Sequence, residues 1–274
     1  MPGPPVTLAD AKDQRFDDYR ALNDQAYRRA YEGDELFVAE GFVAIDRLIE
    51  SGHEIRSVLL APSRVERFST HLATLGERGV PVYVAARDVI TTAVGFDLHR
   101  GVVAVARRHD HPSVAEVAAT ASRFAVLEGL NDAENLGAIA RAARALGIDA
   151  LIVDPRSTDP YSRRSVRVSM GEILLMPIAR PAADDWRDIL GELDRAGVET
   201  WAMSPMPSAE SIWDVEVPER LAVVLGAEGP GLDRRTIARA TRTVRIPLRA
   251  GVDSLNVGHA AAVTFAAIGR PRST

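Results

Sequence analysis

Between residues 35 and 108 the chain alternates short apolar runs with stretches whose apolar side chains recur every three or four residues. The first pattern is typical of buried β-strands, and the second is typical of amphipathic α-helices. The helical spacing is clearest at Phe42, Ile45 and Leu48, and packing in a core accounts for these side chains. The predicted strands are residues 58–61, 82–85 and 102–106. This region is therefore predicted to be one small α/β domain.

The same alternation resumes after residue 113 and includes more strands. The predicted strands are residues 124–130, 150–153, 174–178, 200–203, 221–225 and 244–248. Helical stretches separate successive strands, a pattern that favours parallel pairing with helices covering the sheet. The second region is therefore predicted to be an α/β domain with a mostly parallel sheet.

Polar segments set the predicted domain boundaries. Residues 107–113 are polar, end in a proline-containing stretch and separate the two alternating regions. Residues 1–34 are also polar, with a helix predicted over residues 8–31. We therefore expect an N-terminal arm over residues 1–34, a first domain over 35–110 and a second domain over 111–274.

The composition excludes several kinds of chemistry. The 274-residue chain has no cysteine, which rules out disulfides, thiolate zinc sites, cysteine-ligated iron–sulfur clusters and a cysteine nucleophile. Group transfer that needs a covalent cysteine or a cysteine-ligated radical cluster is thereby excluded, whereas direct transfer to oxygen or nitrogen is not. His109 and His111 lie in the boundary segment, and we interpret them as solvated linker residues. No metal site is predicted.

Charge and hydropathy limit the choice of partner and compartment. The net charge of −5 argues against a protein that coats nucleic acid through bulk electrostatics, although it leaves local contacts with RNA open. No apolar stretch approaches the roughly 18 residues of a membrane-spanning helix, and the N-terminus opens with prolines and charges. We therefore expect a soluble, cytoplasmic protein with no membrane partner.

Three segments that each lead from a loop into a helix carry candidate chemistry. The first, NDAENLGAIARAA at residues 131–143, follows a predicted strand. Asn135 is a good N-cap for the helix, and Arg141 lies almost two turns later, where its long side chain still reaches a site above the strand ends. Taken alone, helix capping and a surface arginine explain both residues.

The second segment, LAVVLGAEGPGL at residues 221–232, runs from a buried strand into a glycine-rich turn and then into a helix at 233–240. Glycines such as Gly226 let the backbone approach a ligand closely. The G-x-x-G-x-G spacing matches neither the dinucleotide fingerprint nor the P-loop, which argues against NAD and ATP. Glu228 would repel a phosphate but would hold a polar or cationic group. An exposed turn glutamate is the alternative.

The third segment, IPLRAGVDSLNVGHA at residues 246–260, leads into a helix of small residues that ends near residue 268. Ser254 and Asn256 flank the predicted helix start, and a serine cap is the simplest reading of either residue alone. A serine hydrolase is not predicted, because the chain shows no G-x-S-x-G elbow with a supporting histidine and acid.

Together, NLGAIARAA, VVLGAEGPGL and IPLRAGVDSLNVGHAAAV resemble the three motifs of the SpoU (TrmH-type) RNA 2′-O-ribose methyltransferases, in the SPOUT superfamily. The match covers roughly residues 125–268, and SVRVSMGEILLMP at 165–177 is similar to that family's segment between its first two motifs. Residues 133–134 depart from it, because members often carry a proline there. The resemblance implies a trefoil-knotted domain, S-adenosylmethionine as cofactor, and a homodimer whose active site lies near the subunit interface.

The resemblance also implies roles for individual residues. The positions whose backbone encloses a bent S-adenosylmethionine are Gly226, Ile246 and Leu255. The active-site positions are Asn135, Arg141, Glu228, Ser254 and Asn256. The resemblance casts Arg141 as the residue that activates the 2′-hydroxyl, yet a guanidinium rarely yields its proton. Pairing of Arg141 with a substrate phosphate and stabilisation of a developing alkoxide remain open alternatives.

Residues 35–110 resemble the L30e-like RNA-binding domain that often precedes this catalytic domain, mainly through GFDLHRGVVAV at 95–105. The resemblance implies that Arg100 and neighbouring basic residues contact the RNA backbone. The predicted function is methylation of a ribose 2′-hydroxyl, with ribosomal RNA favoured over transfer RNA as the partner. Two other functions stay open: a non-catalytic RNA-binding or ribosome-assembly factor, and an enzyme that methylates a base nitrogen.

Overall fold

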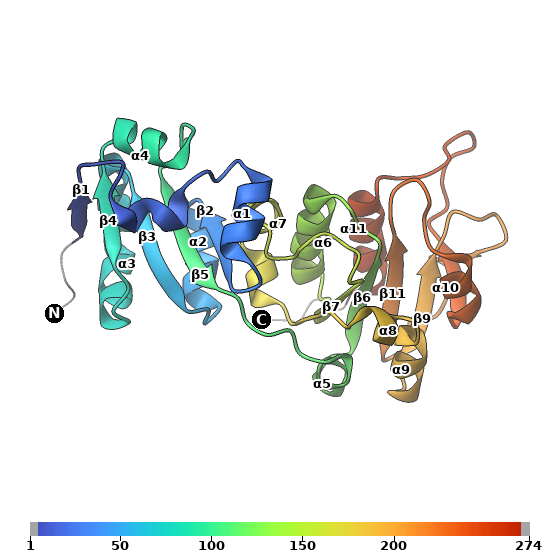
Figure 1. Cartoon of the computed structure of the whole chain (residues 1–274). Coiled ribbons are helices and arrows are strands. Elements are labelled where there is room, and N and C mark those ends of the chain that lie inside the picture. The colour runs from blue at the N-terminus through green and yellow to red at the C-terminus, as the bar shows by residue number, and fades with distance from the viewer. Residues whose placement is uncertain (1–4, 270–274) are drawn as a thin grey trace. The chain divides into compact units, whose positions relative to one another are not determined.

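The computed structural model describes residues 5–269, which divide into two compact units (Figure 1). Unit 1 comprises residues 5–109 and Tyr161–Leu175, and unit 2 comprises the remaining described residues. Each unit is built of β-strands and α-helices around its own sheet. The α/β architecture predicted from the alternating pattern is therefore confirmed for both.

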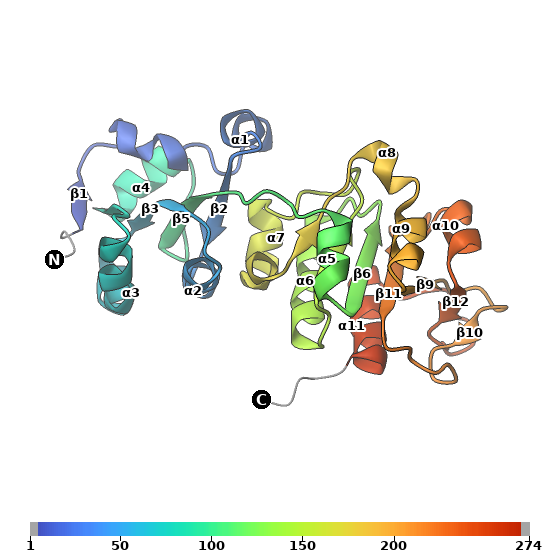
Figure 2. The same ribbon diagram turned by 90° about the horizontal axis from the view of Figure 1, so that it is seen from below.

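Unit 1 contains a five-stranded mixed sheet. Its strands, in spatial order, are β1 (Val6–Leu8), β4 (Val82–Ala85), β3 (Ile55–Leu60), β5 (Val102–Arg107) and β2 (Leu36–Glu40). Strands β1, β4 and β3 pair in parallel, whereas β5 is antiparallel to both β3 and β2. Its helices are η1 (Gln14–Tyr19), α1 (Gln25–Glu32), α2 (Phe42–Glu50), η2 (Pro62–Arg64), α3 (Val65–Glu77), α4 (Arg87–Val94), α7 (Arg163–Val168) and η3 (Glu172–Leu175), where η marks a 3-10 helix. Figure 2 shows α4 on one face of this sheet and α2 and α3 on the other.

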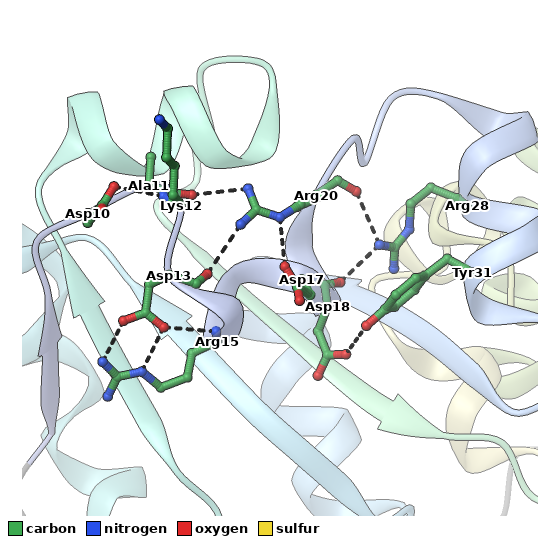
Figure 3. A network of polar contacts seen from close by, with 10 residues as sticks. All are labelled: Asp10, Ala11, Lys12, Asp13, Arg15, Asp17, Asp18, Arg20, Arg28 and Tyr31. Atoms are coloured by element: carbon green, nitrogen blue, oxygen red, sulfur yellow. Dashed lines mark hydrogen bonds and ion pairs between the residues drawn. The ribbon is translucent and has the colours of Figure 1, made fainter.

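The N-terminal segment is part of unit 1 and not the separate arm that its polar sequence predicts. Strand β1 pairs with β4, and the side chains of Phe16 and Tyr19 from η1 are fully buried in the core. A polar network holds the segment that follows: the Tyr31 hydroxyl donates to the Asp18 carboxylate over 2.7 Å (Figure 3). The helix predicted over residues 8–31 is instead a strand and two short helices.

Residues Tyr161–Leu175 also belong to unit 1, although the predicted boundaries assigned them to the second domain. The Arg163 guanidinium pairs with the buried carboxylate of Glu40 over 2.7 Å, and the Tyr161 ring stacks on Phe37 with ring centroids 5.1 Å apart. These contacts join residues more than 120 positions apart, so local patterning could not indicate them.

Two local predictions in and near this segment differ from the structure. The strand predicted over residues 174–178 is instead the 3-10 helix η3 followed by the short strand β8 (Ile178–Ala179), because Pro177 has no N–H with which to extend a strand ladder. The second concerns the two boundary histidines, which were predicted to be solvated: His109 is exposed, whereas His111 is only partly exposed, and both also make contacts in the chain. The ring of His109 stacks on that of His53, with centroids 3.8 Å apart, and Nδ1 of His111 lies 2.9 Å from the Ile178 carbonyl oxygen.

Unit 2 contains a seven-stranded sheet in which every strand pair is parallel. Its strands, in spatial order, are β10 (Glu210–Ser211), β12 (Arg242–Arg245), β9 (Glu199–Met203), β11 (Leu221–Gly226), β6 (Arg123–Glu128), β7 (Ala150–Val153) and β8. Its helices are α5 (Val114–Thr120), α6 (Ala133–Ala145), α8 (Ala183–Trp186), α9 (Ile189–Arg195), α10 (Arg234–Arg239) and α11 (Val257–Ile268). Helices α6 and α11 pack against each other, while α5 and α9 form a second pair (Figure 2). The mostly parallel sheet predicted for this region is confirmed.

The parallel arrangement determines where loops gather. The strands β6 and β11 pair along their full length, so that their last residues, Glu128 and Gly226, lie opposite each other. In a parallel sheet all carboxyl ends meet at one edge, and ligands bind in the crevice outside that edge. The loops that follow β6, β9, β11 and β12 therefore converge at one edge of unit 2.

Candidate active site

A cavity of about 400 Å³ lies at the carboxyl edge of the unit 2 sheet. Its wall comes from three loops, at residues 203–205 after β9, 225–231 after β11 and 246–257 after β12. The volume is in the range of pockets that hold small organic ligands. All three loops follow parallel strands, so the cavity has the position expected of a ligand site in an α/β sheet.

The turn after β11 forms a wall of bare backbone. The N–H of Gly231 donates to the Ala227 carbonyl oxygen over 3.0 Å, which closes the turn on itself. A Cβ atom built on Gly226 would lie 2.6 Å from the Gly231 oxygen and 2.5 Å from the Leu232 nitrogen. Such contacts are too short for any side chain, so glycine at this position is what lets the turn close and present its backbone to the cavity.

Asn256 connects the three predicted segments. It is the N-cap of α11, where its Oδ1 accepts from the N–H groups of Gly258 at 2.9 Å and His259 at 3.2 Å. Its side-chain amide donates to Oδ1 of Asn135 at 3.0 Å and to the carboxylate of Glu228. One side chain therefore caps a helix and also bridges the first and second segments.

The structure brings most of the predicted site residues to this cavity. The residues on its wall are Gly226, Glu228, Ile246, Ser254, Leu255 and Asn256. Asn135 is buried and joins them through its bond to Asn256. The Ser254 side chain is exposed, and within residues 5–269 it makes no hydrogen bond.

Arg141 is the predicted site residue that does not line the cavity. It lies on α6 six positions after Asn135, which is about 9 Å along the helix axis. Its side chain is exposed, and no carboxylate of the described part of the chain pairs with it. Arg141 is therefore available to a group from outside the chain.

Two helix caps differ from the prediction. The N-cap of α6 is Asp132, whose carboxylate accepts from the Glu134 N–H at 2.8 Å, so Asn135 lies inside the first turn. At α11 the cap is Asn256 rather than Ser254. In both places a second capping residue stood within three positions of the expected one. Because Asn135 does not cap α6, its Oδ1 is available to accept from the Asn256 amide across the cavity edge.

The loop after β9 is a part of the site that no sequence motif indicated. Met203, Ser204 and Pro205 line the cavity, and the strand before them was predicted at residues 200–203. The missing information was the strand order, because β9 pairs with β11 although β11 follows it by almost twenty residues. A search for polar residues after every predicted parallel strand would have included Ser204.

The cavity combines backbone with apolar and polar side chains. Ile246, Leu248 and Leu255 supply apolar surface, and the wall also includes Glu228 and Ser254. Within the described residues, no cluster of three histidine or acidic side chains has the arrangement to hold a metal ion. None of the helices between residues 5 and 269 has the length and apolar character needed to cross a membrane. Such a cavity suits an organic ligand with apolar, polar and cationic parts.

Comparison with known proteins relates both units to RNA methylation. A model of the SpoU rRNA methylase family matches residues 122–266. A second model, described as RNA 2′-O ribose methyltransferase substrate binding, matches residues 38–112. The chain is 42% identical over 263 residues to an uncharacterized tRNA/rRNA methyltransferase of Mycobacterium bovis, covering 94% of this chain and 89% of that protein.

More distant relatives cover the chain at similar length. RlmP of Bacillus subtilis, a 23S rRNA (guanosine(2553)-2′-O)-methyltransferase, is 23% identical over 256 residues, which are 93% of this chain and 96% of that protein. An AdoMet-bound rRNA methyltransferase from Sinorhizobium meliloti has a TM-score of 0.80 at 25% identity, covering 97% of this chain and 98% of that one. The SpoU methyltransferase AviRb from Streptomyces viridochromogenes, at 23% identity and a TM-score of 0.78, covers 93% of this chain and 97% of its own and shares the fold.

Proposed function

The chain belongs to the SpoU rRNA methylase family, and we propose that it transfers a methyl group from S-adenosylmethionine to a ribose 2′-hydroxyl of RNA. The observation that carries this proposal is the bond pattern of Asn256, which joins Asn135 and Glu228 at the rim of one cavity. Residues from all three family motifs thereby meet at a single place. RNA methylation is the activity of the family, and the ribose as acceptor is the finer proposal.

The cavity residues fit S-adenosylmethionine. The cofactor has a flat base, a ribose and a cationic sulfonium carrying an amino-acid tail. At Gly226 the backbone lines the cavity without a side chain to cover it, while Ile246 and Leu255 offer apolar contacts. The Glu228 carboxylate at the rim favours a cation over a phosphate. This chemistry supports the cofactor assignment, as does the AdoMet-bound relative with the same fold.

S-adenosylmethionine supplies an electrophilic methyl group, so that an O–CH₃ bond forms while the S–CH₃ bond breaks and the hydroxyl loses its proton. The protein must hold the hydroxyl in line with that methyl group and receive the released proton. Ser254 and Asn256 present polar groups for the ribose at the cavity rim. Glu228, held by the Asn256 amide, keeps the turn after β11 in register with them.

We propose that Arg141 binds an RNA phosphate next to the acceptor nucleotide or stabilises the developing alkoxide. Its exposure and its lack of a carboxylate partner in the described chain support a role toward an external anion.

We also propose that the protein is a homodimer. Ala138 and Ala266 are exposed on the adjacent helices α6 and α11, and small residues there allow a second copy to approach closely. A dimer that covers this face would place Arg141 at an interface.

The proposed domain also contains a trefoil knot. Strand β12 lies beyond β9, on the side away from β11, whereas α11 packs against α6. The chain after β12 therefore passes back across β9 and β11 before α11 begins. This return path supports the knot that the family resemblance implies.

Unit 1 is proposed to hold the RNA through arginines at one edge of its sheet. Arg100 packs against Gly41, Arg64 lies against Gly101, and the Arg67 guanidinium lies 4.2 Å from the Phe42 ring centroid. Within residues 5–269, none of the three arginines pairs with a carboxylate, although many other arginines of this unit do. Replacing all three with alanine should weaken binding to RNAs of every sequence to a similar extent. The slope of log affinity against log salt concentration should also fall, by the contribution of about three phosphate contacts.

Ribosomal RNA is the proposed substrate class, in keeping with the distant relative that methylates 23S rRNA. Transfer RNA is the other candidate, because the relative at 42% identity is described with both. Labelled S-adenosylmethionine, purified protein and each RNA class from a strain lacking the gene decide between them. Label in one rRNA supports the proposal, and label confined to tRNA overturns the substrate class. A protein that binds RNA but neither binds the cofactor nor transfers label would be a non-catalytic factor.

A further inference from the structure

Glu128, the last residue of β6, has a buried carboxylate that does not line the cofactor cavity. Its Oε1 accepts from the backbone N–H of Asp233 at 2.7 Å, and its Oε2 accepts from the Thr236 hydroxyl at 2.5 Å. Only 5% of this residue is exposed. Burial of a carboxylate is costly unless its oxygens are bonded, so these two donors account for its presence here.

The same residue contacts both ends of the turn that forms the cavity wall. Its backbone pairs with Gly226, at the point where β11 ends and the turn begins. Its side chain holds Asp233 and Thr236, at the point where the turn ends and α10 begins. Residues 227–232 therefore span the distance between two points that are both held by Glu128.

The turn itself is closely packed, which makes its shape sensitive to those two points. Gly231 bonds back to Ala227, and Gly226 lies so near Leu232 that no Cβ atom fits between them. A movement of the first residues of α10 must therefore move the turn or break its internal bond. Glu228, which lies in this turn and meets Asn256, would move with it.

We propose that Glu128 is a positioning residue for the cofactor, which it serves by fixing the turn at residues 226–232 in the shape that binds S-adenosylmethionine. The identity of the ligand in this inference rests on the proposed function, whereas the contacts between Glu128 and the turn do not. If the bonds from Glu128 to Asp233 and Thr236 are weakened, the turn spends less time in its binding-competent shape. The apparent affinity for S-adenosylmethionine then falls in proportion to that population.

Four variants separate this role from a loss of general stability. Glu128→Gln keeps the shape but replaces the carboxylate with a neutral amide, which weakens the bond from Asp233 and can only donate to the Thr236 hydroxyl, so both charge-assisted bonds are lost. Thr236→Val removes one of the two bonds. Thr236→Ser keeps the hydroxyl and should behave as wild type. Asp149→Asn is the matched control, because Asp149 also accepts two backbone N–H bonds, from Ser122 at 3.0 Å and Arg123 at 2.9 Å, at the opposite edge of the same sheet.

Amide hydrogen exchange of residues 227–232 without cofactor tests the geometry directly. We expect faster exchange in Glu128→Gln and Thr236→Val than in Thr236→Ser and Asp149→Asn. Equal exchange in all four variants would overturn the positioning role. Thr236→Val is the milder change, so it decides the matter if Glu128→Gln does not fold.

Titration with S-adenosylmethionine tests the consequence. We expect the Kd to rise about tenfold or more in Glu128→Gln and Thr236→Val, with KM for the cofactor raised more than kcat is lowered. Unchanged affinity despite faster exchange would overturn the link to the cofactor. If the wild type binds no S-adenosylmethionine, the proposed function fails, while the exchange comparison still decides whether Glu128 holds the turn.

Discussion

Asn256 has two separable tasks, and a single substitution should divide them. Its Oδ1 caps α11 by accepting from Gly258 and His259, while its amide group donates to Asn135 and Glu228. Asn256→Asp keeps an acceptor oxygen for the cap, and a negative charge is favourable at a helix N-terminus. The same change replaces the amide donor with an oxygen that faces two other oxygens. The cap should therefore survive while the bridge is lost.

The size of each effect follows from these bonds. A neutral hydrogen bond contributes about 1 kcal/mol and one to a charged group about 1.5–3 kcal/mol. Glu228 is exposed, so solvent lowers the second contribution, and the bridge is worth about 1–3 kcal/mol in total. At 1.36 kcal/mol for each factor of ten, methyl transfer should fall roughly tenfold to hundredfold. The free energy of unfolding should change by less than about 1 kcal/mol, because the cap is retained.

The assay measures initial rates of label transfer to RNA at limiting S-adenosylmethionine, together with the thermal midpoint. Asn256→Ser tests the same point without adding a charge, because its hydroxyl also caps the helix but is too short to bridge Asn135 and Glu228. We expect both variants to unfold near the wild-type temperature and to lose activity. Activity within twofold of wild type in Asn256→Asp would refute the reasoning, as would a loss of stability large enough to explain the lost rate.

Three further predictions follow from single residues. Gly226→Ala should raise the Kd for S-adenosylmethionine at least tenfold in a calorimetric titration, because its Cβ would overlap the turn. Its control is Gly197→Ala, at a residue with a positive φ and open space around it. That change should lower the free energy of unfolding by about 1 kcal/mol and leave the Kd unchanged. Arg141→Ala should abolish methyl transfer while leaving cofactor affinity and thermal midpoint as in wild type, since no described residue depends on it; retained turnover would contradict the role proposed for it. Burial and the neighbouring His109 ring lower the pKa of His53 from 6.5 to about 4, so the unfolded chain binds a proton there before the folded chain does. The free energy of unfolding from urea titrations should be unaffected by this group above pH 6.5 and should fall between pH 6.5 and 4 by up to about 3 kcal/mol, and His53→Gln should flatten that slope.

The strands of unit 2 could be predicted from the sequence because their patterns are unambiguous. The uninterrupted apolar run at residues 221–225 forms the strand β11, which is one residue longer than predicted and ends at Gly226. The last strand was placed two residues too late, at 244–248, because β12 begins at Arg242, whose exposed position gives no apolar signal. Local patterning therefore predicts buried central strands better than strands near the edge of the sheet.

The candidate site could be predicted from the three segments, but its contacts could not. Asn135 and Asn256 are separated by 121 positions, and only the packing of α6 against α11 brings them within 3.0 Å. Glu128 carried no recognisable motif, because its partners belong to a helix that starts more than one hundred residues later. Such pairings depend on strand order, which periodicity does not contain. Motif resemblance supplied the roles of single residues, whereas the geometry supplied the link between them.

The central claim is that this protein methylates a ribose 2′-hydroxyl. The most direct test is nuclease digestion and mass spectrometry of RNA that the purified protein has modified with S-adenosylmethionine. We predict one added methyl group on the ribose of one nucleotide, and resistance of that linkage to alkaline cleavage, with the signal sharply reduced for Asn256→Asp. A methyl group on a base, with alkaline cleavage intact at that position, would contradict the account.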